Sequence, residues 1–198
     1  MKLRHLFPAL ALAVASLFAS STAQAQVGIY LNPVVTHVGI STPDTGTYAF
    51  LGDNTTSRWF GGVDIGGYYD FFHAEKFDAG IDIRDTIQHA NNASLNQFTI
   101  AARVAAKPVR YGFRPYGQLA VGSGSTKAPH SNIKATRLAW AITGGADYPI
   151  AKHVDFRVIE LSYGTVTTIS SETERINANI SAAKLVTLSS GLVFRFGK

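Results

Sequence analysis

The sequence has 198 residues, a formal net charge of +5 and no cysteine. The lack of cysteine excludes a disulfide framework and a lipid-modified cysteine. The basic residues are spread along the chain rather than clustered, which argues against a nucleic-acid-binding protein. With 18 glycines and 46% hydrophobic residues, the composition is typical of a membrane protein whose apolar residues alternate instead of forming blocks.

The first 25 residues have the pattern of a cleavable signal peptide. Lys2 and Arg4 precede a short apolar run, and the segment ends in Ala23-Gln24-Ala25, an A-x-A cleavage pattern. The run is too short to cross a bilayer as a helix, which needs about 20 residues, and a retained amphipathic anchor is the less favoured alternative. We predict a signal over residues 1–25 and one exported domain over residues 26–198.

The first predicted strand covers residues 27–38. Ile29 and Leu31 point to one face and Tyr30 to the other, with the period of two that a strand requires. Pro33 interrupts this strand, and because proline cannot donate to a ladder we expect either a bulge or a locally unpaired stretch there. A long polar loop rich in turn residues follows over residues 39–57.

The second predicted strand, residues 58–71, contains the pairs Gly61-Gly62 and Gly66-Gly67. A nucleotide-binding loop is disfavoured because no helix follows whose N-terminus could hold a phosphate. Glycines inside a strand more often mark bends or close backbone approach, which the closure of a barrel needs.

Six further segments repeat the alternation. The third begins at Phe77, and the next five are expected around residues 97–104, 113–122, 137–148, 154–163 and 180–196, the last alternating from Val186 onward. The fourth follows a loop over about 89–95, and a tight turn near Lys107 leads to the fifth. In the seventh, Val158 and Ile159 are both apolar. A one-residue slip flips every later side chain, so we predict a bulge between Val158 and Glu160.

This pattern predicts an all-β fold, an eight-stranded antiparallel up-and-down transmembrane β-barrel. Short turns and long polar loops alternate between the strands, as in outer-membrane barrels. Outward-facing aromatic residues gather at both ends of the strands, as two girdles would require. At the turn end these are Tyr69, Phe71, Phe77, Phe113, Tyr148, Phe156, Phe194 and Phe196, and at the loop end Trp59, Phe98 and Tyr163.

The inward faces carry acidic and basic residues in equal number. They are Asp64, Asp78, Asp82, Asp147, Asp155 and Glu160 against Arg84, Arg103, Arg114, Arg137, Arg157 and Arg195. Side chains just fill an eight-stranded barrel, so these charges must pair with one another or with trapped water. We expect Arg195 to meet Asp70, Asp78 or Asp155. A soluble barrel such as a lipocalin, with its apolar face inward, is the disfavoured alternative.

The chain resembles the small outer-membrane β-barrel superfamily, the OmpA/OmpX-like proteins. The signal ending in Ala23-Gln24-Ala25, the eight-strand pattern and the terminal Ser190-Gly191-Leu192-Val193-Phe194-Arg195-Phe196 carry this resemblance. It implies a location in the bacterial outer membrane. It also implies that the aromatic end of the closing strand, Phe194 and Phe196, is read by the barrel-assembly machinery, although Gly197-Lys198 follow here. Activity is specified poorly, since such barrels host adhesins, stability factors and enzymes.

The leading functional hypothesis is a non-enzymatic barrel that contributes to envelope integrity or to surface interaction through its external loops. We expect a monomer whose partners are outer-membrane lipid and, during biogenesis, the assembly machinery. No cofactor, metal ion or nucleic acid is predicted, and the sequence assigns no ligand to the loops. A small pore is an alternative, but open aqueous channels belong to barrels of about 16 strands.

A barrel enzyme is the third hypothesis. Lipid A deacylases of the superfamily that this chain resembles use a His-x-Ser pair. The nearest candidate here is the adjacent pair His130-Ser131. Neighbouring residues of a strand point to opposite faces, so this pair would not share a proton readily. A protease-like cluster at the external rim could use His37, His89, Asp53 and Asp85. His73 and His153, predicted in turns, lack metal-ligand spacing and are interpreted as surface residues.

Overall fold

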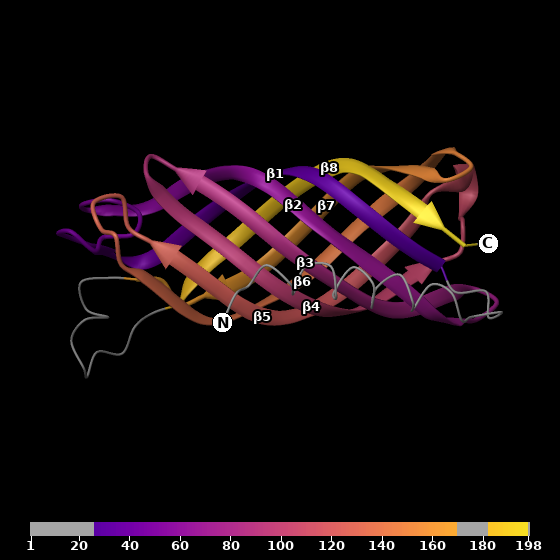
Figure 1. Ribbon diagram of the computed structural model, residues 1–198, viewed down its shortest axis with the longest axis horizontal. Coiled ribbons are helices and arrows are strands. Elements are labelled where there is room, and N and C mark those ends of the chain that lie inside the picture. Colours follow the sequence, from indigo (N-terminus) through magenta and orange to yellow (C-terminus); the bar gives the residue numbers. More distant parts are fainter. Residues whose placement is uncertain (1–25, 170–181, 198) are drawn as a thin grey trace, which may run out of the picture.

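The computed structural model describes residues 26–169 and 182–197, and these residues form a closed barrel (Figure 1). Each strand pairs antiparallel with its neighbour in sequence, and β1 pairs with β8, which confirms the predicted fold. The predicted signal and residues 170–181 of the last external loop lie outside the described residues. The strands are β1 (Gln26–Asp44), β2 (Thr55–His73), β3 (Phe77–Ala90), β4 (Ala93–Ala106), β5 (Arg114–Lys127), β6 (Lys134–Ala151), β7 (Val154–Val166) and β8 (Ala183–Phe196).

The outer wall of the barrel is apolar and the inner wall polar. In β3, for example, Ile81 and Ile83 are exposed, whereas Asp82 and Arg84 between and beside them are buried. Every aromatic residue predicted for the girdles is exposed on the wall, and several pair across strands, such as Phe113 with Tyr148. A helix long and apolar enough to span a membrane is not found in residues 26–169 and 182–197.

The connections depart from the predicted pattern at three places. The first loop, expected over residues 39–57, is shorter, because β1 extends to Asp44 and β2 begins at Thr55. The loop expected over residues 89–95 is wrong, because strand pairing continues to Ala90 and resumes at Ala93. Only Asn91 and Asn92 form the turn, with φ of 45° and 66°, the double positive φ of a type I′ hairpin that asparagine tolerates. The tight turn near Lys107 is also wrong, because β4 and β5 are joined by seven residues that include the short 3₁₀ helix η2 (Arg110–Gly112).

The seam between β1 and β8 shows how the barrel accommodates Pro33. The register is unchanged on either side, since Leu31 pairs with Leu192 and Val34 with Ser189, but the ladder is interrupted between them. Toward β8, Pro33 therefore lies in a locally unpaired stretch and not in a bulge, while on its other side it stays in register with Val63 of β2. The buried Asn32 fills the gap beside Gly191, where an added Cβ would lie 2.3 Å from the Asn32 amide oxygen.

The predicted bulge in β7 is confirmed, and it has a consequence for the interior. The register shifts between Arg157 and Glu160 against both neighbouring strands. Val158 and Ile159 consequently both face outward, at 39% and 51% exposure, while Arg157 and Glu160 are 0% and 2% exposed. The bulge thus turns two oppositely charged side chains of one strand into the lumen, where they pair at 3.1 Å.

The loop end of the lumen is closed by apolar side chains, which the alternation analysis did not anticipate. Inward residues of the strands meet Phe50 and Leu51 from the loop between β1 and β2, and the rings of Phe50 and Phe60 stack at 5.2 Å. We call this cluster the apolar cap. It comprises Val38, Phe50, Leu51, Phe60, Ala93, Leu95, Ala128, Ala139, Val166, Ile169, Ala183 and Leu185.

Truncating the apolar cap is expected to destabilise the barrel. Phe50→Ala should lower the free energy of unfolding by about 3 kcal/mol, because a fully buried ring is lost and a cavity is left. Urea unfolding of the reconstituted protein measures this change. Ile133→Ala, in the exposed loop between β5 and β6, is the control and should cost less than about 0.5 kcal/mol. Equal losses for the two variants would show that the first external loop does not close the lumen.

Candidate functional site

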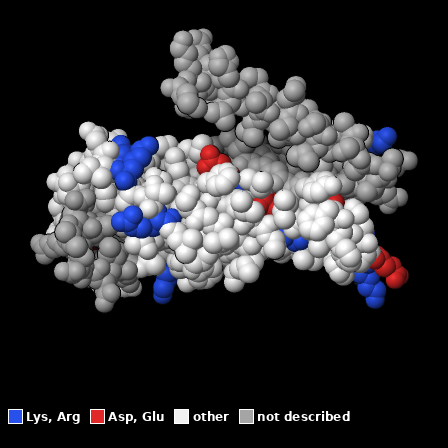
Figure 2. Space-filling view, turned by 60° about the horizontal axis from the view of Figure 1, so that its bottom comes forward, with Lys and Arg blue, Asp and Glu red and all other residues white. Residues whose placement is uncertain are grey.

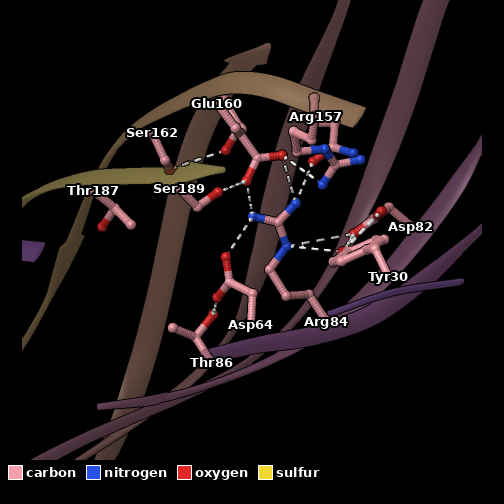
Figure 3. Close-up of polar contacts among 12 residues, drawn as sticks. Tyr30, Asp64, Asp82, Arg84, Thr86, Arg157, Glu160, Ser162, Thr187 and Ser189 are labelled. Carbon is pink, nitrogen blue, oxygen red and sulfur yellow. Dashed lines mark hydrogen bonds and ion pairs between the residues drawn. The ribbon is translucent and has the colours of Figure 1, made fainter. Parts of the chain in front are cut away.

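Below the apolar cap, the lumen is organised around the carboxylate of Glu160 (Figure 3). Arg84 donates to both of its oxygens, at 2.6 and 2.9 Å. Three further hydrogen bonds come from Tyr116 Oη at 2.5 Å, Ser189 Oγ at 3.0 Å and Arg157 Nη1 at 3.1 Å. A buried carboxylate needs charged and hydrogen-bonding partners to offset its desolvation, and these residues supply them from three other strands, β3, β5 and β8, and from the bulge of β7 itself.

Arg84 connects this centre to the β1–β3 side of the lumen. Its Nε donates to Tyr30 Oη at 2.9 Å, and Tyr30 in turn donates to Asp82 at 2.8 Å. Asp64 lies 3.6 Å from Arg84 and accepts a hydrogen bond from Thr86 at 2.5 Å. One guanidinium therefore faces three carboxylates, as Figure 3 shows.

On the side facing the turn end, two more arginines continue the network. Arg157 Nε donates to Asp147 at 3.0 Å. Arg103 Nη1 donates to Asp70 at 2.7 Å, and Arg103 Nη2 lies 3.9 Å from Asp147. Asp147 thus lies between two arginines, so neither of them depends on a single carboxylate.

At the turn end, the last charges pair beside the C-terminal end of β8. Arg195 lies 2.5 Å from Asp155, which is one of the three acids expected for it, and Arg114 lies 3.8 Å from the same carboxylate. Asp78 instead contacts Lys107 and His73, the latter at 2.6 Å. His73 is exposed, as expected for a surface residue, and its ring also contacts this carboxylate.

Three inward tyrosines separate the arginines into a stacked column. Arg103 lies over the rings of Tyr68 and Tyr116, at 3.9 and 4.9 Å from the ring centres, and Arg157 lies over Tyr116 and Tyr30 at 4.9 and 4.5 Å. Arg84 lies 5.2 Å from the Tyr30 ring. The aromatic faces attract each guanidinium and keep these like charges apart, so the three arginines share one narrow lumen with their acids.

Each of these tyrosines lies over a glycine of the neighbouring strand. Tyr68 pairs with Gly28, Tyr30 with Gly66 and Tyr116 with Gly145. A Cβ on any of these glycines would lie 2.2 to 2.6 Å from the tyrosine ring or hydroxyl. The glycines are required because they let a large ring lie flat against the wall, which is the close approach that strand glycines signal.

Arg137 does not join the lumen network, contrary to expectation. Its side chain is exposed and donates to the Thr136 carbonyl at 3.1 Å. The lumen at this level is already filled by the apolar cap. Val166 occupies the space beside Gly124, the cross-strand partner of Arg137. Alternation predicts the face of a residue but not its height, so it placed this arginine inside.

The other predicted lumen residues lie where the strand parity puts them. Asp64, Asp78, Asp82, Arg84, Arg103, Asp147, Asp155, Arg157 and Glu160 are buried, and Arg114 and Arg195 are partly buried. The pattern of inward charges does not single out Tyr30, Tyr116, Ser189, Lys107 or His73 as members of the network. For Tyr30 and Tyr116, the sequence did offer a signal, since both are inward tyrosines whose neighbouring strands are rich in glycine.

Two small polar cavities remain beside the column. One of about 30 Å³ reaches Asp64, Thr86 and Gln118, and another of about 10 Å³ reaches Asp70, Arg103 and other groups near the turn end. A water molecule needs about 10–15 Å³ by this measure, so the cavities have room for single waters. In the described ranges, no three His, Asp or Glu side chains are grouped to hold a metal ion.

The residues considered for catalysis lie apart. His130 is exposed, and Ser131 Oγ accepts a hydrogen bond from the Ile133 amide. His37 packs against the Trp59 ring on the outer wall, and Asp53 accepts from the Gly46 amide inside the first loop. The remaining candidates are on other segments: His89 and Asp85 on the outward face of β3, and His153 in the turn between β6 and β7.

Comparison with known proteins agrees with this architecture. A family model described as outer membrane protein beta-barrel domain matches residues 9–196. The neisserial surface protein A, NspA, superposes with a TM-score of 0.56 at 13% identity, covering 89% of this chain and 100% of that chain. Ail, the attachment invasion locus protein of Yersinia pestis, gives 0.51 at 13% identity, covering 87% and 99%. No curated protein matches the sequence. The chain belongs to the outer membrane protein β-barrel domain family.

Proposed function

We propose that this chain is a non-enzymatic outer-membrane barrel with a closed lumen, which contributes to envelope integrity or surface contact through its external end. The filled interior carries this proposal. The apolar cap closes the loop end, and the Arg–Tyr column with its carboxylates occupies the space below it. Among the described residues, two cavities beside the column measure about 30 and 10 Å³. The lumen therefore acts as a rigid, charge-paired core.

Export and assembly are part of the same proposal. Residues 1–25 would direct secretion and be removed, and the assembly machinery would read the end of β8. Phe194 and Phe196 support this role because both are about half exposed on the outer wall at the turn end, where a partner can reach them. A monomer surrounded by outer-membrane lipid is the proposed final state.

Conductance in planar bilayers tests the closed lumen. We expect no reproducible ion current from the purified, folded mature chain, because the column and the apolar cap both obstruct the lumen. The alternative of a small pore predicts steady conductance whose ion selectivity changes in Arg103→Ala or Arg157→Ala. A current of that kind would overturn the closed-lumen proposal.

The envelope role is tested in cells. Deletion of the gene is expected to raise detergent sensitivity or dye uptake, or to reduce surface binding. Reintroducing the wild-type gene should reverse the change. Unchanged permeability, detergent sensitivity and surface binding would contradict the proposal. Turnover of lipid A or of a peptide that depends on His130 or His89 would replace it with an enzymatic function.

A further inference from the structure

The loop-end half of the β5–β6 hairpin carries positive charge and no acidic residue of its own. Lys127, Lys134 and Arg137 lie on it together with His130, and the sequence from residue 115 to 146 contains no Asp or Glu. None of the three cations has an acidic partner in residues 26–169 and 182–197. Figure 2 shows Lys and Arg side chains gathered at this end of the barrel face that it presents.

One register row brings the outward residues of this region together. His89 on β3 pairs with Ser94 on β4, Ser94 pairs with Lys127 on β5, and Lys127 pairs with Lys134 on β6. We call these four residues the basic row. Their parity is that of the exposed wall residues Phe98, Val121 and Leu138 on the same strands, so all four point away from the lumen. With strands about 4.8 Å apart, the row is roughly 14 Å long.

The pair Lys127 and Lys134 is the unusual part of the basic row. Side chains directly opposite on antiparallel strands have Cβ atoms about 4.5–5.5 Å apart, and like charges in that position destabilise the sheet. Asp85, an acid on the outward face of β3, is four residues along that strand from His89 and two strands from Lys127. That separation of about 16 Å exceeds the screening length of about 8–10 Å at physiological salt.

The height of the basic row places it at the headgroups of the outer leaflet. Aromatic girdles mark the membrane interface, and Ser94 lies four residues beyond the girdle residue Phe98 on β4. At about 3.3 Å per residue and a strand tilt of about 40°, Ser94 is roughly 10 Å above Phe98, and the row is inclined because register partners on tilted strands differ in height. Lysine side chains at such a level extend toward the interface, where lipid phosphates lie.

We propose that the basic row binds the phosphate groups of a phosphorylated glycolipid in the outer leaflet. Lys127 and Lys134 neutralise one phosphate together, which relieves their mutual repulsion, and His89 and Ser94 offer hydrogen bonds to the same headgroup. This inference goes beyond the proposed function and does not depend on whether the lumen is closed.

Binding to the folded mature protein in zwitterionic detergent tests the proposal. The probes are bisphosphorylated lipid A, the same lipid without phosphates, inorganic phosphate and heparin, and the readouts are the bound lipid seen by native mass spectrometry and the thermal midpoint from heat-modifiable gel mobility. We expect the wild type to retain phosphorylated lipid A and to unfold at a higher temperature with it. The double variant Lys127→Ala/Lys134→Ala should bind at least tenfold more weakly.

Controls separate a site from a general charge effect. Lys152→Ala, in the turn at the opposite end of the barrel, removes one positive charge and should bind as the wild type does. Without lipid, the double variant and Lys134→Glu should unfold at the same or a higher temperature than the wild type, since a like-charge pair is removed. This readout shows that both variants are folded.

Four results would overturn the inference. These are equal binding of the lipid without phosphates, unchanged binding by the folded double variant, equal loss of binding in Lys152→Ala, and preference for inorganic phosphate or heparin over lipid A. The last would indicate an ion site or an external polyanion instead. None of them bears on conductance, so the closed-lumen proposal is tested separately.

Discussion

Glu160→Gln is expected to lower the free energy of unfolding by about 3–5 kcal/mol, the cost of removing one partner from a buried ion pair. The substitution keeps the size of the side chain but removes its charge and turns an amide group toward donors. Arg84 and Arg157, both buried, would then lose the carboxylate that accepts from each of them. Tyr116 and Ser189 would lose a charged acceptor as well.

Urea unfolding of the reconstituted barrel, followed by tryptophan fluorescence, measures this loss. Glu75→Gln is the matched control, since Glu75 is exposed in the turn between β2 and β3, and its change should stay within about 0.5 kcal/mol. A double variant with Arg84→Gln should lose less than the sum of the single changes, because each partner is costly mainly when left alone. If Glu160→Gln unfolds like Glu75→Gln, the carboxylate is not the centre of the network.

Gly66→Ala is expected to cost about 3 kcal/mol or more, although it adds only one methyl group. That methyl would lie 2.4 Å from the Tyr30 hydroxyl and 2.6 Å from the Ile83 carbonyl oxygen, so the ring or the backbone must move. Overpacking alone costs about 1–3 kcal/mol. Displacing Tyr30 also removes its hydrogen bonds with Asp82 and Arg84, and bonds to charged groups contribute about 1.5–3 kcal/mol each.

The same strand supplies the control. Gly61 on β2 has open space where its Cβ would lie, so Gly61→Ala should be close to neutral or slightly stabilising. Tyr30→Phe separates the hydroxyl from the ring and should reproduce part of the Gly66→Ala loss. Chemical unfolding of the four proteins under one condition makes the comparison. Equal stability of Gly61→Ala and Gly66→Ala would show that Tyr30 does not need a flat wall.

The sequence by itself determined the number of strands, the faces of most residues and the position of the bulge in β7. Period-two alternation is a local property. Because the outer wall faces lipid and the inner wall faces a filled polar lumen, apolar and polar residues alternate along each strand. The bulge at Val158 and Ile159 could be predicted for the same reason, since a bulge reverses the inward or outward direction of every residue that follows it. Loop lengths could not be predicted as well. Between β3 and β4, a two-residue turn of asparagines with positive φ has the same polar composition as a longer loop, so composition does not distinguish the two.

Only the tertiary structure decided which inward residues meet and at what height. Strand tilt and register bring Glu160 to Arg84 across 76 positions, which no local pattern records. Height explains why Arg137 lies outside the network while Arg157 lies at its centre, since the apolar cap occupies the upper lumen. The pairing of Tyr30 with Gly66 and of Lys127 with Lys134 is likewise a matter of register. Alternation determines a face, and closure of the barrel determines the neighbours on it.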